Sequence, residues 1–171
     1  MGLLGSLYFI GVIVGMAFVP VLADNFGRKW PLIVTLIIFI IGAIGLLVTN
    51  NLYEAYFYMF LIGFTFAGRV VVGLNYTMEY LNVRFHTTTV AAFLQSMAIG
   101  VILFTAWYQL IDRGYFWLQF IVLMFAIASL IFFWAFVPES PKWLYAFGRY
   151  EESKQIMRYV ASANSKPEEK L

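Results

Sequence analysis

Five long apolar stretches dominate the hydrophobic pattern of the chain. Apart from Glu54 at one edge, Arg69 is the only charged residue inside them; they cover about residues 1–23, 30–50, 54–78, 87–110 and 115–138. A helix needs about 20 mostly apolar residues to cross a bilayer. Each stretch therefore predicts a transmembrane helix, and residues 1–138 predict a transmembrane helical bundle.

The composition supports this interpretation. Of the 171 residues, 63% are hydrophobic and 12% are charged, whereas ordinary soluble domains are about 45–50% apolar and 25% charged. A chain of this length cannot bury so much apolar surface in its own core. This excludes a soluble enzyme, a nucleic-acid-binding protein and a disordered chain. It predicts an all-α membrane protein whose main partner is the lipid bilayer.

Residues 139–171 differ from the rest. They hold six of the eleven basic and five of the nine acidic residues. Ser140 is a good N-cap, Pro141 a good first helical residue, and Gly148 a helix stop. We therefore expect an amphipathic helical tail, with short helices over residues 141–147 and 150–163, against the face of the membrane.

The basic residues predict the orientation. If the connectors alternate sides, one side holds nine basic residues, namely Arg28, Lys29, Arg84, Lys142, Arg149, Lys154, Arg158, Lys166 and Lys170, and the other holds Arg113. Loops rich in Lys and Arg face the cytoplasm. We expect the tail in the cytoplasm, or on the matrix side in an organelle, and the N-terminus outside.

The first stretch has an alternative interpretation. Val21-Leu22-Ala23 resembles a signal-peptidase site. However, no basic segment precedes it, and 23 uncharged residues exceed the usual apolar core of a signal peptide. A transmembrane helix is the preferred interpretation.

Small residues mark possible helix contacts. Gly11 and Gly15 are four residues apart, a spacing that lets two membrane helices approach closely. Glycine is also simply common in membrane helices, so this pattern alone leaves both explanations open.

Two motifs lie on the expected cytoplasmic side. Residues 24–29 read Asp-Asn-Phe-Gly-Arg-Lys and join two stretches by a tight turn, in which Gly27 can adopt a positive φ. Residues 138–144 read Pro-Glu-Ser-Pro-Lys-Trp-Leu and are followed by Gly148, Arg149 and Glu152. An ordinary basic turn and an interfacial helix would explain these segments without any function.

Both motifs nevertheless resemble those of the major facilitator superfamily. The first is similar to Gly-x-x-x-Asp-x-x-Gly-Arg-Arg/Lys, and the second to the Pro-Glu-Ser-Pro-Arg-Trp-Leu of its organic cation/anion transporter branch, with sugar porters as near neighbours. The spacing from Gly63 to Glu79 also matches. The resemblance implies five transmembrane helices of an N-terminal half, corresponding to family helices two to six.

The chain also departs from the family pattern. Pro20 replaces the first glycine of the turn motif, Met59 stands where an arginine is usual, and Arg84 comes early. No counterpart of the first helix or of helices seven to twelve is found. Transport in this family needs two six-helix halves that rock around a central site. We therefore expect another membrane chain or a larger complex to supply the missing helices, unless the sequence is part of a longer gene product.

Arg69 is the unusual charge, because it lies roughly 20 Å into the third stretch at helical rise. Such residues usually face a bundle interior or a cavity. The candidate cavity residues are Tyr58, Thr65, Arg69, Tyr76 and Gln95. The functional interpretation is a wall that binds an anionic group. The structural alternative is an arginine that snorkels to the interface or pairs with Glu79, and Gln95 could bond between helices instead.

Charged residues should also cluster at the cytoplasmic ends of the helices. The resemblance implies a gate made of ion pairs that break when this side opens. The gate and motif residues are Asp24, Gly27, Arg28, Lys29, Glu79, Arg84, Glu139 and Arg149. Static surface pairs, worth at most about 1 kcal/mol each, are the alternative.

Two functions follow. The first is transport of a small organic solute or ion as part of a major facilitator-type secondary transporter. The second is a degenerate, transporter-like accessory subunit with a structural role. An enzyme is not expected, and neither is a cofactor or a metal, because the chain has no cysteine and only one histidine, His86.

Overall fold

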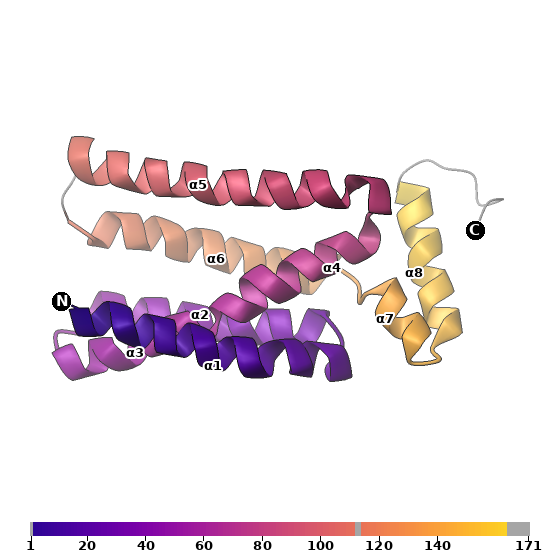
Figure 1. Ribbon diagram of the computed structural model, residues 1–171, viewed down its shortest axis with the longest axis horizontal. Helices are drawn as coiled ribbons and strands as arrows, with labels where there is room; N and C mark the ends of the chain where they lie inside the picture. Colours follow the sequence, from indigo (N-terminus) through magenta and orange to yellow (C-terminus); the bar gives the residue numbers. More distant parts are fainter. Residues whose placement is uncertain (1, 112–113, 164–171) are drawn as a thin grey trace.

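The computed structural model describes residues 2–111 and 114–163, and every regular element in these two ranges is helical (Figure 1). Five helices in this part are long and apolar enough to cross a membrane, which confirms the predicted all-α membrane fold. They are α1 (Gly2–Phe26), α2 (Lys29–Val48), the composite span Leu52–Tyr80, α5 (His86–Leu110, with a 3₁₀ turn η2, Val83–Phe85, before it) and α6 (Phe116–Phe136). Met1, Arg113, Lys166 and Lys170 lie outside the described residues.

Helix α1 packs very closely against α3 (Leu52–Phe64), the first part of the composite span. A Cβ atom on Gly11 would collide with the carbonyl oxygen of Phe60, and one on Gly63 would collide with the carbonyl oxygen of Tyr8. The backbones therefore touch because both helices carry glycine at the crossing. The close approach at Gly11, and at Gly15 against the carbonyl oxygen of Phe64, favours the helix-contact explanation of this pair over the general abundance of glycine in membrane helices.

The hydrophobic core lies where α1, α2 and the composite span meet. Its buried side chains are Val19, Ala23, Leu32, Leu36, Ala67 and Val72. Helix α1 continues through Ala23, which is fully buried. The segment that resembled a signal-peptidase site is thus an internal part of a packed helix.

The composite span is not a uniform α-helix. A π-helical turn, η1 (Ala67–Val72), separates α3 from α4 (Gly73–Tyr80). A π turn inserts an extra residue into the helix and often occurs at functional sites. Arg69 lies in this turn.

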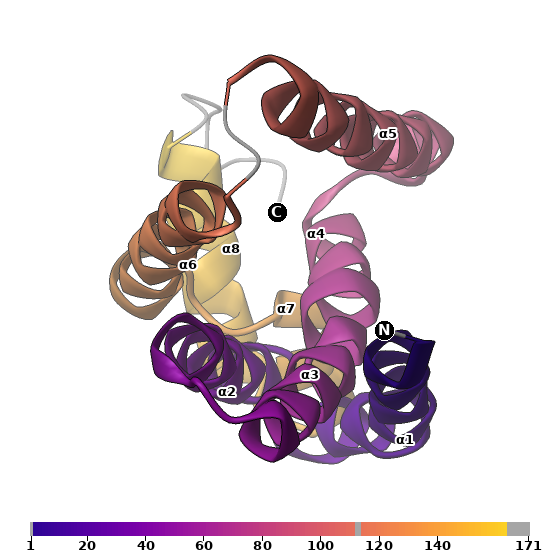
Figure 2. The same ribbon diagram turned by 90° about the vertical axis from the view of Figure 1, so that its left-hand side faces the viewer.

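Helices α5 and α6 differ in how they are held. Helix α6 packs on α2, and Gln119 donates a hydrogen bond of 3.1 Å to the carbonyl oxygen of Ala43. Helix α5 has no buried residue along its 25 residues, and it stands apart from α6 when the bundle is viewed end-on (Figure 2). The bundle is therefore open on the side that α5 borders.

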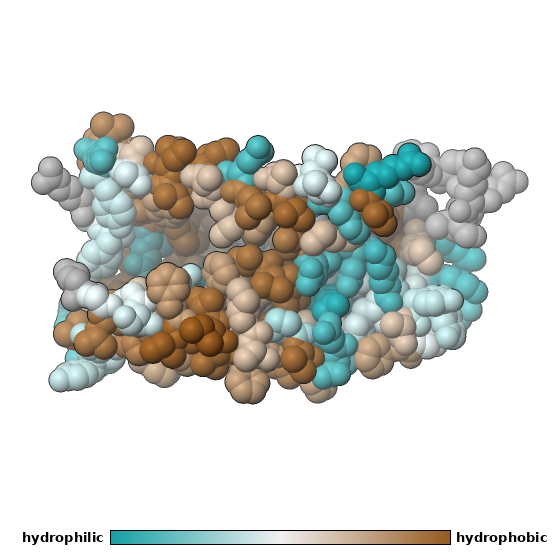
Figure 3. Space-filling view, viewed as in Figure 1, coloured by the Kyte–Doolittle hydropathy of each residue, from teal (hydrophilic) through white to brown (hydrophobic). Residues whose placement is uncertain are grey.

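The tail forms two helices, α7 (Pro141–Ala146) and α8 (Tyr150–Ala163), as predicted. Ser140 accepts a hydrogen bond from the Trp143 amide, and Gly148 has a φ of 76°. Figure 1 shows α8 running across the direction of the spanning helices at one end of the bundle. Strongly polar residues gather toward this end, while apolar residues cover the middle of the bundle (Figure 3).

Candidate functional site

The turn between α1 and α2 is built around a carboxylate from a distant part of the chain. Gly27 has a φ of 100°, and a Cβ atom there would meet the carboxylate of Glu139. The Glu139 carboxylate accepts hydrogen bonds from the backbone amides of Arg28 (2.8 Å), Lys29 (3.1 Å) and Ser140 (3.0 Å). A negative charge is favourable at a helix N-terminus, so Glu139 caps α2.

Arg28 joins two helices. Its guanidinium forms an ion pair with Asp24 of α1 and another, at 3.1 Å, with Glu79 of α4. The Arg28 and Glu79 side chains are only 18% and 16% exposed, whereas Asp24 is 64% exposed. The pair with Glu79 is therefore shielded from water, and shielding strengthens charge-assisted hydrogen bonds.

Two tyrosines of α4 hold the segment that follows α6. The Tyr76 hydroxyl donates to the carbonyl oxygen of Pro138, and the Tyr80 hydroxyl lies 3.0 Å from that oxygen and 2.9 Å from the carbonyl oxygen of Glu139. Ser153 of α8, which is buried, donates to the carbonyl oxygen of Pro141 at 2.9 Å. The ends of α2, α4, α6, α7 and α8 are thus joined by hydrogen bonds at one place.

We call Asp24, Arg28, Glu79, Glu139, Tyr76 and Tyr80 the Arg28 cluster. The structure brings most of the expected gate residues together here. Lys29 contributes its backbone amide, and its Nζ lies 3.4 Å from the carbonyl oxygen of Trp134. Arg84 is exposed near the start of α5, and Arg149 pairs instead with Glu152 at 2.6 Å. Those two residues lie apart from the cluster.

A second polar site surrounds Arg69 near the middle of the bundle. The guanidinium lies over the Phe39 ring of α2, 3.8 Å from its centroid, which is a cation–π contact. Its buried Nε has no hydrogen-bond partner among the described residues. A cavity of about 290 Å³ adjoins it, and Thr77, Thr89 and Ser129 are among the residues that line this cavity. We call this the Arg69 cavity.

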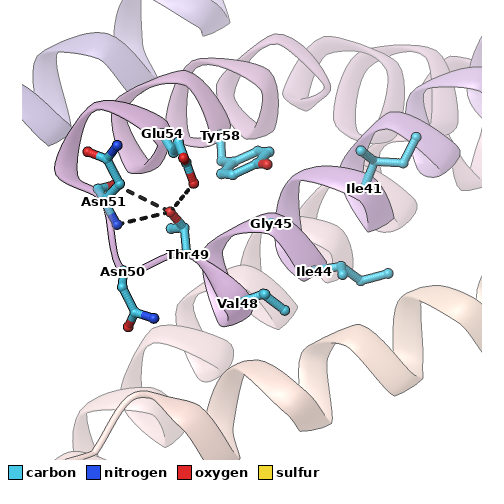
Figure 4. Close-up of a pocket in the computed structure, with 9 residues that line it drawn as sticks. All are labelled: Ile41, Ile44, Gly45, Val48, Thr49, Asn50, Asn51, Glu54 and Tyr58. Atoms are coloured by element: carbon cyan, nitrogen blue, oxygen red, sulfur yellow. Dashed lines mark hydrogen bonds between the residues drawn. The ribbon is translucent and has the colours of Figure 1, made fainter.

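The other candidate cavity residues lie elsewhere. Tyr58 lines a pocket of about 670 Å³ at the opposite end of the bundle from α7 and α8, beside the α2–α3 turn (Figure 4). There the Thr49 hydroxyl donates to Glu54 at 2.6 Å. Thr65 is buried and donates to the carbonyl oxygen of Ile62. Gln95 is exposed on α5 and does not line the Arg69 cavity.

Comparison with known proteins gives the family. The model of the family described as "Sugar (and other) transporter" matches residues 1–170. The chain belongs to this family. It is 26% identical to mouse solute carrier family 22 member 2, covering 94% of this chain and 29% of that protein. It is 31% identical to mouse solute carrier family 22 member 7, with the same two shares, and 30% identical to human organic cation/carnitine transporter 2, covering 93% of this chain and 28% of that protein.

These relatives confirm the resemblance to the organic cation/anion branch of the major facilitator superfamily. The chain spans less than a third of the length of the curated relatives it matches. As a member of this transporter family with five long apolar helices, it is an integral, multi-pass membrane protein.

Three residues that contact the Arg28 cluster or Arg69 are not among the candidates that the sequence predicts. The Tyr80 hydroxyl donates to the carbonyl oxygen of Pro138, and the Trp143 indole donates to the carbonyl oxygen of Asp24 at 2.9 Å. The Phe39 ring makes the cation–π contact with Arg69. The i, i+4 pair Tyr76 and Tyr80 at the end of an apolar stretch was a usable signal for the first. The other two contacts depend on how the helices pack.

Proposed function

We propose that this chain forms part of a major facilitator-type secondary transporter for a small organic solute or ion. The observation that carries the proposal is the Arg28 cluster, in which one arginine bridges α1 and α4 while Glu139 caps α2. The transporter relatives and the family match over nearly the whole chain support it. Their activity, as transporters, also favours a transporter over an enzyme for this chain.

In the proposed mechanism, the Arg28 cluster holds one side of the transporter closed. Opening this side requires helix ends to separate, and the interactions that must then break are the pair between Arg28 and Glu79 and the hydrogen bonds to Glu139. Because these groups are partly buried, breaking them is costly unless water or new partners replace them. A discrete set of contacts of this kind makes a two-state gate.

We further propose that residues 139–171 form a cytoplasmic tail and that residues 1–138 form the membrane bundle, with the N-terminus outside. Cysteines introduced at Asn50, on the α2–α3 turn, and at Glu151, on α8, test this in a chain that has none. Both positions are exposed. In intact cells a membrane-impermeant maleimide should label Asn50→Cys and spare Glu151→Cys until the cells are permeabilised. Labelling of both in intact cells would contradict the orientation.

The open side beside α5 bears on what else the transporter contains. Helix α5 has no buried residue, and the Arg69 cavity opens between α4, α5 and α6. An unpaired arginine inside a membrane is costly. We propose that further helices cover this side, whether they come from the rest of a longer chain, from another membrane chain or from a larger complex, and that the Arg69 cavity then binds an anionic group of the solute.

We expect the 171-residue chain alone to show no transport. Proteoliposomes that contain only this chain should take up labelled organic cations and anions at the rate of empty vesicles, because two halves are needed for alternating access. The control is liposomes with a complete family transporter prepared in parallel. Saturable uptake by the chain alone would contradict the expectation and indicate that copies of this chain assemble into a transporter.

The Arg69→Leu variant separates transport from an accessory, structural role. If Arg69 binds solute, the substitution should leave the amount of assembled complex in native membranes unchanged. It should reduce uptake per complex roughly tenfold or more, as expected for a lost charge-assisted contact. If Arg69 is structural, the substitution should instead reduce the amount of complex and leave uptake per complex unchanged. Thr105→Val, a change at an exposed position of α5 that does not line the Arg69 cavity, is the control for general effects on the bundle.

A further inference from the structure

The two tail helices enclose a cleft that the transport proposal does not use. It has a volume of about 380 Å³ and is lined by Tyr145 of α7 and by one side of α8, namely Tyr150, Ser153, Lys154, Met157 and Arg158. Residues 150, 154 and 158 are spaced four apart and therefore share one helix face. A tyrosine and two cations are thus presented together along the cleft.

The charge of the cleft is positive. Of the residues that line it, Lys154 and Arg158 are basic and none is acidic. Glu152 is engaged by Arg149, outside the cleft lining. Glu151 lies 3.3 Å from Lys154, but their side chains are 84% and 60% exposed, and such a pair is weak and readily exchanged.

The cleft lies close to the end of a membrane span. Only residues 137–140 separate the end of α6 at Phe136 from the start of α7 at Pro141. Helix α8 runs across the direction of the spans (Figure 1), which places it along the membrane surface when α6 crosses the bilayer. Tyr145 and Tyr150 are 63% and 51% exposed, and tyrosine is enriched at the depth of lipid headgroups.

We propose that the cleft between α7 and α8 binds the phosphate-bearing headgroup of an anionic lipid. Lys154 and Arg158 supply the positive charge, and guanidinium and ammonium groups are the usual partners of phosphate oxygens. The Tyr145 and Tyr150 hydroxyls offer hydrogen bonds to the rest of the headgroup. The site anchors the end of the bundle that carries the Arg28 cluster, because Ser153 ties α8 to the Pro141 carbonyl.

Native mass spectrometry of the full chain in detergent micelles tests the proposal. The probes are dioctanoyl phosphatidylinositol 4-phosphate, dioctanoyl phosphatidylcholine and inorganic phosphate. We expect the anionic lipid to bind at least tenfold more tightly than phosphatidylcholine. The double variant Lys154→Gln/Arg158→Gln should weaken binding of the anionic lipid roughly tenfold, because two basic contacts near the headgroup are lost.

A matched control removes the same charge outside the cleft. The variant Lys142→Gln/Arg149→Gln changes two exposed basic residues of the same tail that do not line the cleft, and it should weaken binding less than about threefold. Equal losses in the two double variants would show nonspecific attraction by the tail and overturn the proposal. Complete displacement of the lipid by millimolar inorganic phosphate would also overturn it, because free phosphate would then be the ligand.

The test is independent of transport. The readout is binding to the chain itself, so loss of uptake in other experiments leaves it unaffected. Lys154 and Arg158 are both exposed, so the variants should retain the helical circular dichroism spectrum of the parent chain. A variant that keeps that spectrum and still binds the anionic lipid with parental affinity would contradict the assigned site.

Discussion

Replacement of Gly11 by leucine is expected to separate α1 from α3 and destabilise the whole bundle. A side chain at this position would occupy the space of the Phe60 carbonyl oxygen, and the Phe64 amide nitrogen lies only 2.9 Å from the expected Cβ. Both obstacles are backbone atoms, so no rotamer change relieves the collision. Overpacking of interiors costs about 1–3 kcal/mol even where side chains can move, and we expect the upper end or more here.

The matched control lies on the same helix. Gly5 has nothing within 4 Å of its expected Cβ atom, so Gly5→Leu adds the same apolar side chain without a collision. Thermal unfolding in detergent, followed by tryptophan fluorescence, should show a midpoint lowered by many degrees for Gly11→Leu and little changed for Gly5→Leu. Similar midpoints for the two variants would show that the α1–α3 crossing does not depend on close backbone contact.

Replacement of Glu139 by alanine should have the second large effect. It removes the acceptor of the Arg28, Lys29 and Ser140 amides, which lie in a partly buried turn. Leaving buried donors without partners costs about 1–3 kcal/mol, and α2 also loses its stabilising N-terminal charge. Hydrogen exchange of the Arg28 and Lys29 amides should accelerate, and the unfolding midpoint should fall.

Two variants make this result specific. Glu139→Gln keeps an acceptor oxygen but not the charge, so it should retain part of the amide protection. Glu152→Ala removes another carboxylate of the same tail, but its pair with Arg149 is about half exposed and is worth at most about 1 kcal/mol. If Glu139→Ala and Glu152→Ala gave the same small change, the cap on α2 would contribute little to stability.

The number and type of the spanning helices could be predicted from the sequence because a bilayer requires long apolar helices. The tail helices were also predictable, since Ser140, Pro141 and Gly148 are local signals whose effect does not depend on distant residues. The positive φ of Gly27 followed from the shortness of the turn for the same reason.

The sites were only partly predictable, because they depend on how the helices pack. Arg69 stands out in the sequence as a charge within an apolar stretch. Its contact with the Phe39 ring on α2, however, depends on helix packing, and the π turn that contains Arg69 has no clear sequence signal. The position of Glu79 on the same stretch makes it a possible partner of Arg69, but Glu79 pairs with Arg28. Tyr58 is a candidate cavity residue together with Arg69 in the sequence, whereas the structure places Tyr58 beside the α2–α3 turn.

The cap on α2 has a consequence for biosynthesis. Glu139 lies 111 residues after the Arg28 amide that it binds. At about 5–20 residues per second, the ribosome needs roughly 5–20 s to make the intervening chain. During that interval the first turn of α2 lacks its acceptor, and the α1–α2 hairpin sits in the membrane without its final restraint. The emergence of Glu139 thus completes a structural element that was translated 111 residues earlier, so the bundle can close at this end only when α6 has been inserted.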